Sequence, residues 1–182
     1  YKKTMIQLIN NNNYSMYKIF FFLTLFALIL RLGFFIGSGS YKNKPIQDPL
    51  SYHRHAVSLV NAGVYGGKSF DSNVAKENRV YISSSTRPPG LPFAIAGVYK
   101  MIGSTNYNYG RVFMIIISSL SVGLLYIISI NSGLSNKMSL ISGLVWGAFP
   151  TSIYYSVLLL SENLALMLML CIVLLLQKFV KG

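Results

Sequence analysis

Acidic side chains are rare in this chain, and two of its four stand beside or inside apolar runs. Glu162 lies within the stretch 157–176, which is otherwise almost wholly apolar, and Asp48 comes soon after the first long apolar run. An ionised carboxylate at the centre of a bilayer costs about 2.5–3.5 kcal/mol. A carboxylate can act as a general base, or it can hold a proton or a cation. Asp48 and Glu162 are therefore the first candidates for chemistry.

The other acids and the histidines indicate less. Asp71 and Glu77 fall in the polar stretch 64–86, which predicts a loop with both carboxylates solvated. His53 and His55 are two residues apart on a predicted helix, so they point to different faces and do not predict a shared metal ion. The sequence assigns no set of metal ligands.

Long uncharged runs indicate which elements carry these residues. Hydrophobic residues make up 53% of the chain and charged residues 11%, against about 25% charged in a soluble domain. A helix that spans a membrane needs about 20 mostly apolar residues. We therefore predict an all-α membrane protein with about four transmembrane helices, at 17–37, 111–130, 139–154 and 157–178.

Lysines beside these helices set their orientation. If the helices alternate in direction, the lysines fall on one side, which the positive-inside rule makes cytoplasmic. They are Lys2, Lys3, Lys18, Lys137, Lys178 and Lys181. The N-terminus and a tail of residues 1–16 are then cytoplasmic, and the long segment 38–110 lies outside.

The outer segment contains two predicted juxtamembrane helices. The first, about 49–62, has Asp48 as its N-cap and Gly63 as its C-cap, and its apolar stripe predicts a helix that lies along the membrane surface. The second, about 89–102, begins at a Pro-Pro pair and is too short to span.

This topology moves Glu162 away from the bilayer centre. The helix 157–178 starts at the outer face, so Glu162 is about 7–8 Å deep at a rise of about 1.5 Å per residue. Asp48 lies at the same face, and the two carboxylates are predicted to converge there.

The net charge of +12 raises the question of an anionic partner. The basic residues are spread through a membrane chain and form no dense block, which argues against nucleic acid. Anionic membrane lipids or phosphorylated substrates fit the charge better.

Several short motifs occur in a characteristic order along the chain. They read Asp48-Pro-Leu-Ser-Tyr52, Gly63-Val-Tyr65, Arg87-Pro88-Pro89-Gly90-Leu91-Pro92, Gly110-Arg111 and then LLLSENLALML around Glu162. This order resembles the GT-C class of integral-membrane glycosyltransferases, in particular the group of protein O-mannosyltransferases and the lipid A aminoarabinose transferase. The resemblance covers about residues 17–178 and matches only the N-terminal part of such enzymes. Because the chain also begins with Tyr1, we expect it to be a piece of a longer protein.

The resemblance implies a function and a site. Such enzymes move a sugar from a polyprenyl-phosphate donor to a lipid, glycan or protein acceptor at the outer face of the membrane, here the bacterial inner membrane. By position, Asp48 resembles the general base, Tyr52 its aromatic neighbour, and Arg87 the cation that contacts the donor phosphate. Glu162 resembles the second catalytic acid, and Arg111 is a further substrate-binding candidate. No cofactor is assigned, and the need for a divalent metal stays open.

Simpler roles stay open for each of these residues. Asp48 could be an N-cap only, and Glu162 could be an acid favoured by the helix dipole. Arg87 could snorkel to the surface, while Tyr52 and Arg111 could anchor helices at the interface. Among whole-protein alternatives, a transporter or flippase-like protein for lipid-linked sugars would use Glu162 as a proton or cation site. A membrane scaffold without catalysis is a third reading.

Overall fold

The computed structural model describes residues 2–68, 80–84 and 86–181, and seven α-helices account for most of them. These helices are α1 (Lys2–Gly37), α2 (Gln47–Ala62), α3 (Gly90–Ile102), α4 (Tyr107–Asn131), α5 (Asn136–Ala148), α6 (Pro150–Ser156) and α7 (Ser161–Lys181). A short 3-10 helix (Ser40–Lys42) follows α1. The prediction of an all-α protein is confirmed, apart from one small hairpin.

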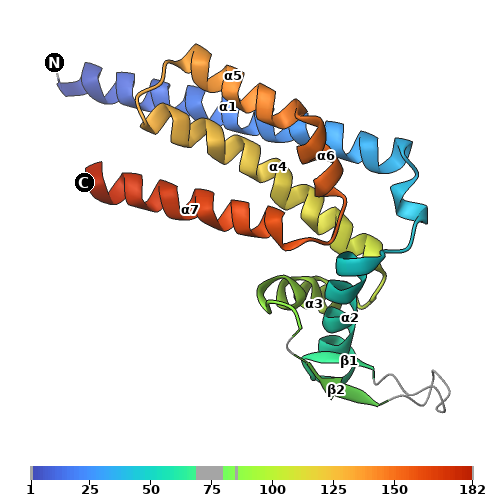
Figure 1. The fold of residues 1–182 in the computed structure, drawn as a ribbon. Coiled ribbons are helices and arrows are strands. Elements are labelled where there is room, and N and C mark those ends of the chain that lie inside the picture. Colours follow the sequence, from blue (N-terminus) through green and yellow to red (C-terminus); the bar gives the residue numbers. More distant parts are fainter. Residues whose placement is uncertain (1, 69–79, 85, 182) are drawn as a thin grey trace.

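The helices form a bundle with a smaller unit at one end (Figure 1). In the bundle, α4 packs against α1, α5 and α7. The chain termini and the α4–α5 connection lie at the other end. The smaller unit consists of α2, α3 and the hairpin, and a shared core attaches it to the bundle. That core contains Tyr52, Ala56, Leu91, Ile95, Ala96, Tyr99, Met114 and Leu159.

Three helices of the described chain are long and apolar enough to cross a membrane. The candidate spans are Ser15–Gly37, Tyr107–Asn131 and Ser161–Val180. The first is the C-terminal part of α1, which extends back to Lys2 through the segment expected to be a tail. A membrane protein is therefore well supported by length and composition.

The single helix predicted at 139–154 is wrong. Instead, α5 ends at Ala148 and α6 begins at Pro150, with Phe149 extended between them. Proline has no backbone N–H to donate and drives the residue before it out of the helical region. With 13 residues, α5 is about 20 Å long, short of the about 30 Å of a bilayer core.

A buried arginine forms hydrogen bonds to the helices on both sides of this break. Arg31 of α1 is fully buried, and its Nε donates to Ser118 Oγ of α4 at 3.0 Å. Its Nη1 donates to the Gly147 carbonyl at 3.2 Å, near the C-terminus of α5, and its Nη2 to Ser152 Oγ of α6 at 2.8 Å. The cation thus lies where the helix dipole of α5 is negative and joins four helices.

The start of α2 also differs from the prediction. Its N-cap is Ile46, whose side chain makes no capping bond, and Asp48 lies in the first turn rather than at the cap. At the other end, Gly63 is the C-cap in the left-handed conformation, as predicted. The carboxylate of Asp48 is therefore not used for capping.

The stretch 64–86, expected to be a loop, contains two short antiparallel strands. β1 (Gly66–Lys68) pairs with β2 (Tyr81–Ser83), with Gly67 opposite Ile82. Asp71 and Glu77 lie outside the described residues. The hairpin packs against α2 and leads the chain back to Arg87.

Candidate functional site

Asp48 and Arg87 form an ion pair between α2 and the segment that precedes α3. Arg87 Nη2 donates to Asp48 Oδ1. The side chains are 53% exposed for Asp48 and 29% for Arg87. An ion pair this exposed contributes only about 0–1 kcal/mol, so it says more about position than about stability. Two predicted site residues, distant in the sequence, are brought into contact.

Tyr52 connects this pair to the bundle. It lies one helical turn after Asp48, and the Arg87 guanidinium carbon is 5.6 Å from the centre of its ring, within reach of a cation–π contact. The ring is buried, while its hydroxyl donates to Ser161 Oγ at 3.2 Å. Tyr52 therefore joins α2, Arg87 and the start of α7.

Glu162 follows at the end of this chain of contacts. Ser161 Oγ makes a long hydrogen bond of 3.5 Å to Glu162 Oε2. Since α7 begins at Ser161 and not at the predicted 157, Glu162 lies in its first turn and is exposed. The positive end of the helix dipole favours a carboxylate there.

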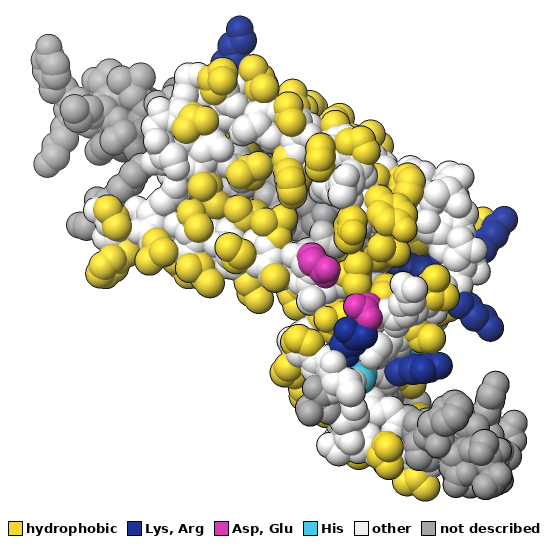
Figure 2. Space-filling view, in the orientation of Figure 1, with side chains coloured by type: hydrophobic (Ala, Val, Ile, Leu, Met, Phe, Trp, Pro, Cys, Tyr) yellow, Lys and Arg dark blue, Asp and Glu magenta, His cyan; other side chains and the backbone are white. Residues whose placement is uncertain are grey.

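We call Asp48, Tyr52, Arg87, Ser161 and Glu162 the junction cluster, because it lies where the smaller unit meets the bundle. The two acidic side chains of the described residues lie on the same face at this junction (Figure 2). Four of the five predicted site residues belong to it. Ser161 was not predicted, and no signal in the sequence distinguishes it from other serines.

Tyr65 of the Gly-Val-Tyr motif binds the backbone of Arg87. Its hydroxyl donates to the Arg87 carbonyl at 2.6 Å, and its ring stacks on Phe93 with centroids 5.8 Å apart. Burial, and then the neighbouring Tyr52, raise the pKa of the Tyr65 hydroxyl, which keeps it protonated as a donor. The motif was noted in the sequence, but this role was not.

The residue before Asp48 has a strained backbone. Gln47 has a φ of 50°, in the left-handed region that residues other than glycine rarely adopt. Such strain costs about 1–3 kcal/mol and is found preferentially at functional sites. It fixes the direction in which α2 starts, and so the position of the Asp48 carboxylate.

Arg111 lies elsewhere. It is buried, and its Nη1 donates to the Ser40 carbonyl at 2.6 Å and to the Asn43 carbonyl at 2.8 Å. Its guanidinium also lies over the Tyr107 ring at 4.9 Å. In the described part of the chain, no hydrogen bond or ion pair links it to the junction cluster. These contacts attach the segment after α1 to the start of α4.

The two histidines of α2 make separate contacts. His53 Nδ1 is 2.9 Å from the Tyr99 hydroxyl, and His55 Nδ1 is 2.8 Å from the Ser51 carbonyl. Burial, with repulsion from Arg54 and Arg111, lowers the pKa of His53 to about 4, so it is neutral at pH 7. Burial also raises the pKa of Tyr99, so its hydroxyl keeps its proton and can donate a hydrogen bond to Nδ1 in the tautomer that carries the ring proton on Nε2.

The described residues offer few ligands for a cation. Across residues 2–68, 80–84 and 86–181, no group of three His, Cys, Asp or Glu side chains is placed to hold a metal ion. Asp48 and Glu162 are the acidic side chains in these ranges.

Comparison with protein-family models, with curated proteins and with solved structures finds no match for this chain. The geometry of the junction cluster is thus what a functional proposal has to rest on.

Proposed function

We propose that this protein is a membrane glycosyltransferase that moves a sugar from a polyprenyl-phosphate donor to a lipid, glycan or protein acceptor. The observation that carries the proposal is the contact of Asp48 with Arg87 beside Tyr52, with Glu162 reached through Ser161. A base and a phosphate-binding cation within one cluster at the end of a helix bundle are what this reaction needs.

The chemistry assigns one step to each side chain. The acceptor hydroxyl attacks the anomeric carbon, the bond from that carbon to the phosphate oxygen breaks, and the configuration inverts. Asp48 takes the hydroxyl proton, and the leaving phosphate departs as an anion that Arg87 neutralises. Tyr52 holds the guanidinium through its ring, and Glu162 is the second carboxylate, placed to orient the acceptor.

The ion pair leaves Arg87 with donors to spare. One terminal nitrogen, Nη2, contacts Asp48, and the buried Nε has no hydrogen-bond partner among the described residues. A guanidinium has five N–H donors and binds phosphate through two at once. A donor phosphate would thus bind beside Asp48, which brings the base close to the anomeric carbon.

The cell location follows from the same proposal. The junction cluster faces the outer side of a bacterial inner membrane, and the N-terminus is cytoplasmic. The architecture is the N-terminal part of a GT-C-type enzyme, with the α2–α3 unit in the first outer segment. A divalent metal would reinforce Arg87 in neutralising the phosphate.

A transporter or flippase-like protein for lipid-linked sugars is the second candidate. The break between α5 and α6, beside the buried Arg31, favours it, because interrupted helices line many transport sites. The described acids count against it, since both lie at helix ends and not at the break.

The deciding experiment uses the full chain in liposomes with radiolabelled polyprenyl-phosphate sugars. We expect Asp48→Asn to reduce sugar transfer at least 100-fold, because a general base contributes about 10²–10⁴-fold. Arg54→Gln, at an exposed position of the same helix, is the matched control and should transfer normally. Near-normal transfer by Asp48→Asn would reject the base. Donor that crosses the bilayer with its sugar–phosphate bond intact would favour the transporter.

A further inference from the structure

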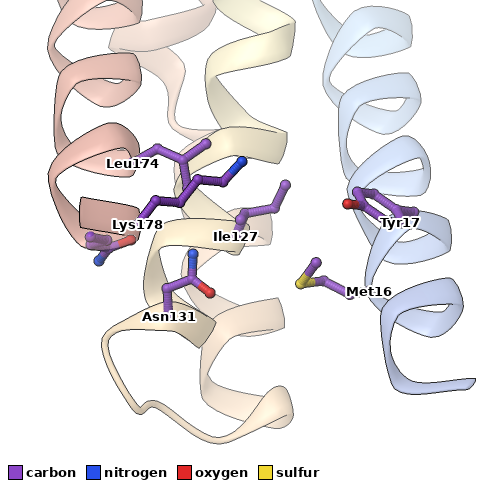
Figure 3. A pocket seen from close by; sticks show the side chains of 7 residues that line it. Met16, Tyr17, Ile127, Asn131, Leu174 and Lys178 are labelled. Atoms are coloured by element: carbon purple, nitrogen blue, oxygen red, sulfur yellow. The ribbon is translucent and has the colours of Figure 1, made fainter. Parts of the chain in front are cut away.

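The end of the bundle away from the junction cluster has a feature of its own. A pocket of about 500 Å³ opens there between α1, α4 and α7. Each helix supplies one apolar wall residue, namely Met16, Ile127 and Leu174 (Figure 3). Ligand pockets in proteins measure about 300–1,000 Å³, so this one has room for part of a lipid.

The pocket lies at the level where the three candidate spans end. Met16 is near the start of the first span, Ile127 near the end of the second, and Leu174 near the end of the third. Span ends lie in the headgroup layer of a bilayer. A lipid can therefore enter from the side with its chain toward the membrane core.

Polar groups gather at the same pocket. Tyr17, Asn131 and Lys178 come from the three helices, and Lys178 extends from α7 toward α4. Lys178 brings a positive charge to the pocket. Lys137, in the first turn of α5, adds another at the same end of the bundle. The acids among the described residues, Asp48 and Glu162, are both at the junction. The charge at this end thus complements an anion.

Gln177 holds the wall of the pocket in place. Its Nε2 donates to the Ile128 carbonyl at 3.2 Å and to Ser132 Oγ at 2.8 Å. These bonds tie the end of α7 to the end of α4, so the wall exists before a ligand binds. A preformed pocket costs less ordering entropy on binding.

We infer that this pocket binds one anionic phospholipid, with its phosphate on Lys178 and the first part of one acyl chain against Met16, Ile127 and Leu174. Tyr17 and Asn131 are polar neighbours of the headgroup. The site is separate from the junction cluster, and the inference does not depend on the proposed glycosyltransferase activity.

Native mass spectrometry of the full chain in detergent tests whether the charge of Lys178 selects anionic lipids. The protein is mixed with equal amounts of phosphatidylglycerol and phosphatidylcholine, and bound lipids are counted. We expect about fivefold more phosphatidylglycerol, the factor that one lysine near the surface supplies. Lys178→Ala should abolish this preference, and Lys178→Arg should retain it. Lys137→Ala is the matched control, an exposed lysine at the same end but outside the pocket.

A second pair of variants tests the apolar wall. Leu174→Trp fills the pocket and should reduce binding of phosphatidylglycerol at least threefold. Leu175→Trp, at the exposed position next to it, should not. Equal retention of both lipids by the unmodified protein, or an equal effect of Lys178→Ala and Lys137→Ala, would overturn the inference. So would displacement of the lipid by glycerol phosphate at millimolar concentration, which would indicate a soluble phosphate as the ligand.

Discussion

Different residues contact the side chain and the backbone of Arg87. Asp48 accepts a hydrogen bond from its Nη2, while Tyr65 donates to its carbonyl and fixes the backbone. The backbone of Arg87 is thus fixed by Tyr65, and its guanidinium is paired with Asp48. A phosphate that binds the free edge of the guanidinium meets a cation that is already oriented.

The variant Arg87→Ala tests this role. We expect it to raise the KM for the polyprenyl-phosphate donor at least tenfold and to leave the KM for the acceptor within a factor of two, because the phosphate belongs to the donor. Initial rates at varied donor and acceptor give both constants. Lys100→Ala, an exposed lysine of α3, is the control. A rise confined to the acceptor KM would reject the phosphate contact.

His53 makes stability depend on pH. Its pKa is lowered from 6.5 to about 4, first by burial and then by Arg54 and Arg111, so the unfolded chain takes up a proton at a higher pH than the folded one. Its contribution is complete above pH 6.5 and is lost as the pH falls toward 4. We expect the melting temperature in detergent to fall between pH 7 and pH 5, and to fall less in His53→Gln. Parallel pH curves for the two proteins would contradict this.

At the residue scale, the sequence predicted the members of the junction cluster better than their contacts. Asp48 could be selected because acids are rare here, and Arg87 because its Arg-Pro-Pro motif resembles that of the GT-C group. Their contact depends on how the hairpin turns the chain back, which no local pattern encodes. Arg31 was not among the predicted site residues, because burial among serines and carbonyls leaves no mark in the sequence.

Among the helices, α1 and α4 cross closely at a glycine. A methyl group on Gly123 would clash with Thr24 Oγ1 and lie 2.7 Å from the Phe20 ring. By contrast, a methyl on Gly33 of α1 meets nothing within 4 Å. Small residues at such crossings let membrane helices approach each other.

Two alanine variants compare these glycines. We expect Gly123→Ala to lower the free energy of unfolding by about 1–3 kcal/mol, because the crossing must open. Gly33→Ala should not lower it and should raise it by up to about 1 kcal/mol, because alanine favours the helix and has free space there. Unfolding in mixed micelles, followed by circular dichroism, measures both. Equal stability of the two variants would mean that α1 and α4 do not pack as described.

Element boundaries could be predicted where a single residue type determines them. Gly63 ends α2 because glycine adopts the left-handed cap readily, and Pro89 precedes α3. The helix predicted at 139–154 runs across Pro150, where the structure instead has a break between two helices. The hairpin was missed because strands of three residues, one of them Gly-Gly-Lys, have no alternating pattern.

At the scale of the whole molecule, the two proposed sites lie at opposite ends of the bundle. Three spans place the N-terminus, the α4–α5 connection and the C-terminus at one end, and the α2–α3 unit at the other. If the bundle crosses a membrane, the junction cluster faces one compartment and the Lys178 pocket the opposite leaflet.

Single cysteines test this arrangement in cells, in a background where Cys171 is replaced by alanine. We expect Ser83→Cys to react with a membrane-impermeant maleimide added outside, and Leu134→Cys to react only after the membrane is opened. Both positions are exposed, so access depends on the side of the membrane. The reverse pattern would invert the orientation, and labelling of both from outside would reject the bundle as a membrane-spanning unit.

The partners of Arg31 also set an order on biogenesis. The helix that carries Arg31 is made before its partners, because Ser118, Gly147 and Ser152 are synthesised 87–121 residues later. Until they arrive, the guanidinium has to remain near water, or be shielded by the insertion machinery, since an arginine at the helix centre costs about 2.5–3.5 kcal/mol. If the bundle crosses a membrane, the span Ser15–Gly37 reaches its final depth only when α5 and α6 pack beside it, so helices made later secure one made earlier.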